Sequence, residues 1–179
     1  MVLALVVAMV GSAFAIAPAG ASASCNFGGL TAAETDLCTP TAKASLLASG
    51  ELIAPAGAPA KVKAVIAAAN KIRLKPYIYG GGHASFASRG YDCSGSVSFA
   101  LHGGNFLSSP LPSGPLESWG EEGEGRWITV YANAGHAYMT VAGFRFDTAG
   151  DSGVDETGPR WHEELLTNEG FVARHPAGF

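Results

Sequence analysis

One cysteine stands at the start of a predicted helix, in the run Tyr91-Asp92-Cys93-Ser94-Gly95. Asp92 is a favourable N-cap residue, so the helix should begin at Cys93 or Ser94 and should stop at Gly103-Gly104. The positive end of a helix dipole stabilises a thiolate at such a position, and a thiolate is a good nucleophile. The run therefore indicates cysteine chemistry. The alternative is a buried structural thiol.

Cysteine catalysis also needs an imidazole beside the thiol and a polar group that orients the imidazole. His136 is the strongest candidate, because it opens an alternating, strand-like segment and rigid strands hold catalytic groups well. His102 lies nine residues beyond Cys93 on the same predicted helix, which places it on the opposite face. The three remaining histidines are predicted to lie in a poorly fixed Gly-rich loop (His83) or at the surface (His162 and His175).

Asp147 is the natural partner for His136. If Ala142-Gly143 form a two-residue turn, Tyr138 falls opposite Asp147 on the neighbouring strand. His136 and Asp147 then lie diagonally on one face, about 7–8 Å apart between backbones and within side-chain reach. The competing partner for Asp147 is Arg145, which shares its face.

Hydrophobic periodicity supplies the elements that must hold these residues. The pattern predicts helices first and then an antiparallel meander, which is typical of an α+β domain. Residues 148–158 are Gly- and Asp-rich and are predicted to form a loop. The expected helices are Pro59–Ile72, the helix that begins at Cys93, and a short Trp161–Leu166; the expected strands are Trp127–Ala132, His136–Ala142, Phe144–Asp147 and Gly170–Arg174.

The N-terminal segment reads as a targeting signal. An apolar run, Met1–Phe14, leads to Ala21-Ser22-Ala23, which fits the signal-peptidase pattern, although no basic residue precedes Lys43. We predict a signal peptide over 1–23, an Ala/Gly/Pro-rich leader over 24–58 and a catalytic domain over 59–179, with no stable membrane insertion after cleavage. An uncleaved membrane anchor is the alternative.

Cysteine usage fits an exported protein. Cys25 and Cys38 flank a short polar loop and could pair in an oxidising compartment. Cys93 would then be the odd cysteine, and an odd cysteine in a secreted chain indicates a reactive thiol.

The charge pattern excludes some partners. The net charge is −4, so no general basic face for nucleic acid is expected. Five basic residues do fall between Lys61 and Lys75; they indicate either a solvated helix face or a surface for anionic wall polymers. His162-Glu163 lacks the second histidine of a zinc-protease motif and no C-x-x-C pair occurs, so no metal or other cofactor is expected.

Three motifs occur in a meaningful order. They are Tyr77-Ile78-Tyr79-Gly80-Gly81, Asp92-Cys93-Ser94-Gly95, and Gly135-His136 at the start of an apolar strand. This set resembles the NlpC/P60 cell-wall peptidases over roughly residues 60–150, and the ordered set is more specific than any single motif. The resemblance implies a papain-like core and hydrolysis of peptide bonds in peptidoglycan stem peptides, next to D-glutamate or diaminopimelate.

The resemblance also implies roles for individual residues. Cys93 matches the nucleophile, His136 the general base, and Tyr77 a tyrosine whose hydroxyl approaches the thiol. Asp147 occupies the third polar position, where the family more often has His, Asn or Gln. Substrate contacts are expected from the loop and the helix start, at Gly81, His83, Asp92 and Ser94.

The sequence thus predicts a secreted, monomeric cysteine peptidase of the cell envelope that acts on peptidoglycan peptides. Two alternatives stay open: a catalytically silent wall-binding module, and a thiol amidase or acyltransferase on the same fold. The bond cleaved and the role of the leader are also open. The Pro- and Gly-rich insertion before Trp127 is expected to reshape the substrate groove.

Overall fold

The computed structural model describes residues 43–150, 156–163 and 165–179. The predicted signal peptide and the Cys25–Cys38 pairing lie outside the described residues. No helix within these ranges is long and apolar enough to cross a membrane. The elements are β1 (Ser45–Leu46), β2 (Leu52–Ile53), α2 (Ala60–Ile72), α3 (Cys93–Gly103), α4 (Ser113–Leu116), β3 (Glu121–Glu122), β4 (Ile128–Ala132), β5 (Ala137–Val141), β6 (Phe144–Ala149), β7 (Glu156–His162) and β8 (Val172–His175).

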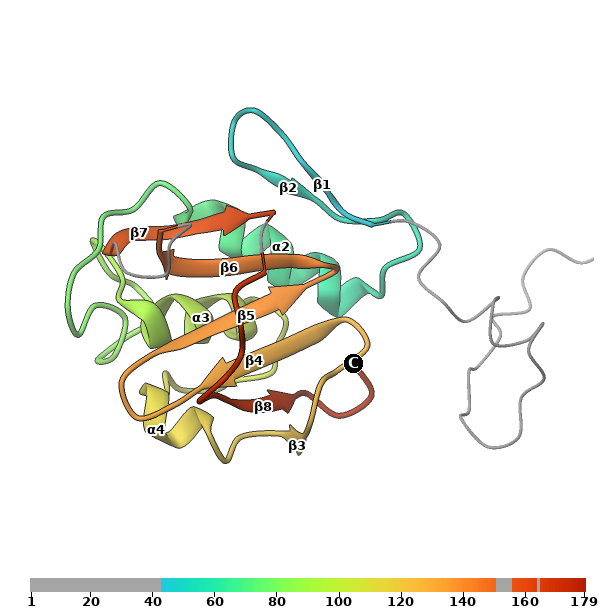
Figure 1. The fold of residues 1–179 in the computed structure, drawn as a ribbon. Helices are drawn as coiled ribbons and strands as arrows, with labels where there is room; N and C mark the ends of the chain where they lie inside the picture. The colour runs from blue at the N-terminus through green and yellow to red at the C-terminus, as the bar shows by residue number, and fades with distance from the viewer. Residues whose placement is uncertain (1–42, 151–155, 164) are drawn as a thin grey trace, which may run out of the picture. The chain divides into compact units, whose positions relative to one another are not determined.

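A six-stranded antiparallel sheet forms the centre of the molecule, in the order β3-β8-β4-β5-β6-β7. Helices α2 and α3 pack against one face of this sheet (Figure 1). The predicted α+β class is therefore confirmed, as are the helix that ends at Ile72 and the meander of β4, β5 and β6.

Alternation along the strands explains this packing. Every second residue of β4 and β5 is apolar and enters the core beneath the helices, while α2 contributes a stripe at helical spacing. Burial of each Val, Ile or Met side chain in this set stabilises the fold by about 1.5–3 kcal/mol. The strand residues of this core are Ile128, Val130, Ala132, Ala137, Met139 and Val141, and the α2 residues are Val62, Val65, Ile66, Ala69 and Ile72.

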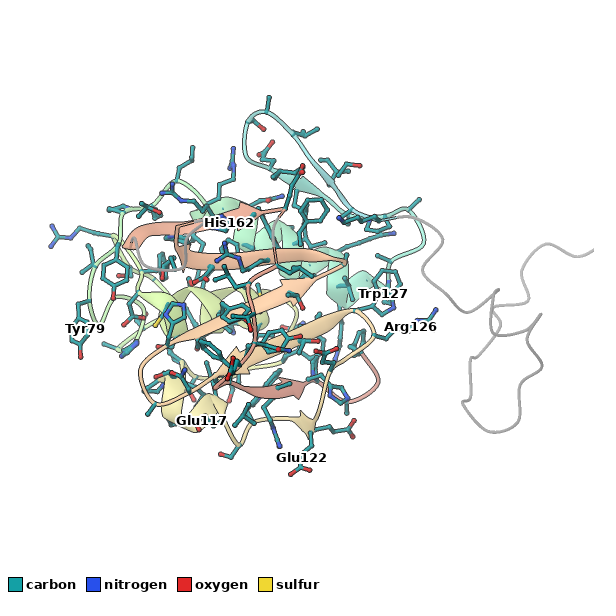
Figure 2. All side chains as sticks on the ribbon, viewed as in Figure 1. Tyr79, Glu117, Glu122, Arg126, Trp127 and His162 are labelled. Carbon is teal, nitrogen blue, oxygen red and sulfur yellow. The ribbon has the colours of Figure 1, made fainter. Side chains whose placement is uncertain are left out.

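The predicted helix over Trp161–Leu166 is wrong. Trp161 and His162 lie at the end of β7, which pairs with β6 through Phe146↔Trp161 and Arg145↔His162. This pairing supplies backbone hydrogen bonds and buries the indole against Phe146, so tertiary context overrides a weak local pattern. His162, labelled on this strand in Figure 2, is consequently buried and not at the surface.

The last part of the predicted leader is ordered on the domain. Hairpin β1–β2 inserts Leu52 into the core, and the Asn70 side chain of α2 binds both backbone polar groups of Leu52, at 3.0 and 2.9 Å. Asn70 Oδ1 also accepts a hydrogen bond from the Trp161 indole at 2.9 Å. One amide thus joins the hairpin, α2 and β7.

Candidate active site

Helix α3 presents Cys93 at its first position, as predicted. Asp92 is the N-cap, and its Oδ1 accepts the Gly95 N–H at 2.8 Å. The backbone N–H groups of Cys93 and Ser94 donate to no other described residue. Two unpaired amides at the positive end of a helix are suited to stabilise an oxyanion that forms beside the cysteine sulfur.

The Gly-rich loop lies directly against this helix start. Asp92 Oδ2 accepts the Gly80 N–H at 3.0 Å, and the Gly81 carbonyl accepts the Asp92 N–H at 3.2 Å. A Cβ on Gly95 would collide with the Gly81 carbonyl oxygen. Glycine in the Asp-Cys-Ser-Gly run is therefore needed for the close approach of loop and helix.

His83 is held firmly, contrary to the expectation of a poorly fixed loop residue. Its Nε2 lies 3.0 Å from Asp92 Oδ1 and 2.9 Å from Ser94 Oγ. Asp92 and Ser94 are only 3% and 2% exposed, and Gly81 is also buried, so these groups organise the helix start. Their role in substrate binding stays a prediction.

The hairpin of β5 and β6 has the predicted register. Val141 pairs with Phe144 across a two-residue turn, in which Ala142 and Gly143 have φ values of 49° and 86°. Positive φ at both positions is typical of a type I′ turn. His136, just before β5, consequently reaches the next strand, and its Nε2 lies 2.9 Å from Asp147 Oδ1.

Asp147 contacts both of the partners expected from the sequence, His136 and Arg145. Its Oδ2 accepts from Arg145 Nη1 at 2.7 Å, while Oδ1 contacts His136 and the backbone N–H groups of Thr148 and Ala149. Arg145 and Asp147 are fully buried. Burial alone would raise the pKa of Asp147, but the hydrogen bond and charge of His136, with smaller contributions from Ala149 and Arg145, hold it below its usual value. Asp147 is therefore a fixed carboxylate.

His136 lies between this carboxylate and the thiol. Burial would lower the pKa of the imidazole, but hydrogen bonds to Asp147 and to Cys93, together with the charges of both groups, raise it to about 10. Nε2 faces Asp147, so Nδ1 is the ring nitrogen left for Cys93. The imidazolium form is thus favoured at neutral pH beside a group that can become a thiolate.

Two residues that the sequence analysis missed support the His136 turn. Asn133 Oδ1 accepts the N–H groups of Gly135 and His136, both at 2.9 Å, and its Nδ2 donates to the Gly170 carbonyl at 3.3 Å. Phe171 then packs edge-on against His136, with ring centroids 6.2 Å apart. An Asn in a predicted hairpin turn is a local signal for Asn133, whereas nothing local to Phe171 indicates its partner.

Phe171 belongs to a segment that covers the second face of the sheet. Residues 165–171 cross the strands on the face opposite α2 and α3 (Figure 1). There the Phe171 ring contacts Tyr138 at 5.1 Å, and Tyr138 stacks on Tyr131 at 5.0 Å. The imidazole of His136 therefore has an aromatic support that is independent of Asp147.

The remaining sequence candidates are placed as follows. Tyr77 is half-buried. It forms an isolated β-bridge with Tyr91, in which the Tyr91 N–H donates to the Pro76 carbonyl at 3.1 Å. Tyr77 therefore lies beside Tyr91, which precedes Cys93 by two residues. The catalytic role of Tyr77 stays a prediction. Tyr79 is 90% exposed and projects into solvent (Figure 2). Across the described ranges, no three His, Cys, Asp or Glu side chains are grouped to hold a metal ion.

No protein-family model matches the chain, and no curated protein sequence does either. Solved structures do match. The peptidoglycan hydrolase RipB from Mycobacterium tuberculosis is 22% identical, with 64% of each chain covered and a TM-score of 0.47. An NlpC/P60 family protein from Bacillus cereus is 18% identical over 65% of this chain and 40% of its own, with a TM-score of 0.48.

RipD from Mycobacterium tuberculosis, described as a non-catalytic NlpC/p60 domain protein adapted to peptidoglycan binding, is 17% identical. The match covers 66% of this chain and 98% of RipD, with a TM-score of 0.47. These structural neighbours are NlpC/P60 proteins. That is the family which the ordered motifs of this chain resemble. The chain spans 62% of a matched RipA structure and 64% of RipB.

Proposed function

We propose that this chain is a cysteine peptidase that hydrolyses a peptide bond in peptidoglycan stem peptides. The observation that carries the proposal is the arrangement of His136, whose Nε2 lies 2.9 Å from Asp147 Oδ1 and whose pKa is raised by both Asp147 and Cys93. A nucleophile, a base and a group that orients the base are the parts that thiol acyl transfer requires.

In the proposed reaction the Cys93 thiolate attacks the scissile carbonyl carbon, and a C–S bond forms. The oxyanion accepts hydrogen bonds from the Cys93 and Ser94 amides. The His136 imidazolium then gives its proton to the leaving nitrogen as the C–N bond breaks, which leaves a thioester and a free amine.

Deacylation reverses these roles. Neutral His136 takes a proton from a water molecule, and the resulting hydroxide attacks the thioester carbonyl. The C–S bond breaks, and the carboxylic acid leaves while Cys93 regains its thiolate beside the imidazolium. Asp147 holds one ring orientation throughout, because Arg145 and two backbone amides fix its carboxylate.

The substrate class rests on the motifs around the thiol. The Tyr77–Gly81 loop and the Asp92–Gly95 helix start resemble those of NlpC/P60 peptidases, and the described contacts give both motifs a defined position. Export to the cell envelope, through a signal peptide over 1–23, belongs to the same proposal, and so does action as a monomer.

The test is digestion of purified peptidoglycan and of synthetic stem peptides by the wild type and by Cys93→Ala, followed by mass spectrometry of the products. We expect new peptide termini with the wild type only. His102→Ala is a matched control, because His102 stacks on Phe86 and binds the Leu107 carbonyl on the far side of α3.

Two results would overturn the proposal. Equal cleavage by the wild type and Cys93→Ala would remove the thiol from the reaction. Equal binding of muropeptides by both, with no cleavage by either, would favour a non-catalytic wall-binding module. Release of an amine without peptide cleavage would instead identify an amidase or acyltransferase.

A further inference from the structure

A cavity lies at the edge of the sheet, between the end of α2 and strand β7. Its volume is about 420 Å³, within the range of small-ligand sites. Among the described residues that line it, three are cationic, namely Arg73, Lys75 and Arg160, and none is acidic. The whole chain has 15 acidic and 11 basic residues, so this cavity concentrates positive charge against the overall balance.

Backbone carbonyls hold both guanidinium groups in position. Arg73 donates to the Asn70 carbonyl at 2.7 Å and to the Ser49 carbonyl at 3.3 Å. Arg160 donates to the Thr157 carbonyl at 2.6 Å. A guanidinium has five N–H groups, so each arginine keeps further donors. Because the side chains are already ordered, a ligand would lose less conformational entropy on binding them.

Lys75 adds an uncommitted charge. Its ammonium makes no hydrogen bond or ion pair with any residue in the described ranges, whereas Arg73 also pairs with Glu51 at 3.3 Å. Among the described residues, three cations and one carboxylate leave an excess of about two positive charges around the cavity. Thr157 contributes to the same wall.

Two basic residues at the start of α2 contact other parts of the fold instead of the cavity. Lys61 lies over the Phe106 ring at 4.9 Å, and Lys63 binds the Ala56 carbonyl at 2.6 Å. The basic cluster between 61 and 75 is therefore divided: its first members support the fold, and only its end contributes to the cavity.

We propose that this cavity binds the phosphate group of a phosphate-bearing ligand. A terminal phosphate has a charge of about −1.5 to −2 at pH 7, which matches the excess charge of the cavity better than one carboxylate does. Its oxygens also suit the planar donors of two arginines and the point charge of a lysine. The site is separate from the Cys93 chemistry and does not depend on it.

The test is NMR titration of the ¹⁵N-labelled full chain at pH 7 and constant ionic strength, with inorganic phosphate and, separately, acetate. We expect phosphate to cause saturable shifts of the backbone amides of residues 73–75, 157, 158, 160 and 161. Lys75→Gln should weaken this binding by about fivefold or more. Arg126→Gln removes an equal charge outside the cavity and should change it less than about twofold.

Equal shifts with acetate and phosphate, or phosphate shifts elsewhere in the chain, would overturn the assignment. So would unchanged binding by Lys75→Gln. Alkylation of Cys93 should be the same in Lys75→Gln as in the wild type, which keeps this test distinct from that of the peptidase activity. Circular dichroism of both variants checks that they are folded.

Discussion

Two histidine–aspartate pairs in the described part of the molecule have nearly the same length. His83 lies 2.9 Å from Asp92, and His136 lies 2.9 Å from Asp147. In the first pair one ring nitrogen, Nε2, contacts both Asp92 and Ser94. In the second pair the ring lies between a carboxylate and a thiol.

This difference shows that a short His–Asp distance does not by itself identify a catalytic base. Asp92 uses its carboxylate to join the Gly-rich loop to the start of α3, through the N–H groups of Gly80 and Gly95. Asp147 is instead held by Arg145 and the local backbone, so it can hold His136 in turn. The first pair builds the helix start, and the second raises the pKa of His136.

The largest expected difference between the pairs is in activity. His136→Ala should lower kcat/KM for stem-peptide cleavage by about 10²–10⁴-fold, because it removes the proposed general base. His83→Ala should lower it by less than about tenfold, since the backbone contacts of Asp92 stay in place. Steady-state kinetics on one synthetic peptide measures both variants, and a comparable loss in the two would end the distinction.

The second-largest expected difference between the pairs is in how their contribution to stability depends on pH. The pKa of His136 in the folded protein, about 10, lies above its ordinary value of about 6.5. Its pairing therefore stabilises the fold fully below about pH 6.5, and the contribution is lost as the pH rises through about 10. The pKa of Asp147 is lowered, so its contribution is present above its ordinary value and is lost as the pH falls.

We accordingly expect the Tm difference between the wild type and His136→Gln to be largest near pH 5–6 and to shrink toward pH 10. Thermal unfolding followed by circular dichroism across pH 4–10 measures it. A difference that grows with pH would contradict the raised pKa of His136. The same series with His83→Gln provides the matched profile for the other pair.

The start of α3 and the contact between His136 and Asp147 were predictable from sequence, for a physical reason. The helix start follows from local N-cap chemistry at Asp92, and the contact of His136 with Asp147 follows from strand parity once the turn length is fixed. Both depend on residues that are close in sequence or on a simple period. Their roles in catalysis stay predictions.

The pairing of His83 with Asp92, and the contacts of Trp161 and Phe171, were not predictable in the same way. A Gly-rich loop indicates local freedom, and nothing in its composition shows that His83 reaches Asp92 and Ser94 across the chain. The strand at Trp161 depends on pairing with β6, and the support of His136 by Phe171 depends on the path of residues 165–171. These contacts are non-local, so patterns over a few residues do not contain them.

A smaller effect is expected from the packing that holds the first pair. Gly95→Ala would place a Cβ against the Gly81 carbonyl, and overpacking of this kind costs about 1–3 kcal/mol. Gly114→Ala is the matched control, because a Cβ there meets nothing within 4 Å. Urea denaturation of both variants measures the cost, and equal free energies of unfolding would show that loop and helix are not tightly apposed.

The smallest effect concerns the turn that carries the second pair. Asn133→Ala removes the acceptor for the His136 N–H and the donor to the Gly170 carbonyl, so it frees the turn from residues 165–171. We expect kcat to fall about three- to tenfold, in line with about 1 kcal/mol for a hydrogen bond, while KM changes little. Asn133→Asp keeps the acceptor and should recover most of kcat. If Asn133→Ala and Asn133→Asp lose the same activity, the contact with Gly170 positions His136 and the turn itself does not.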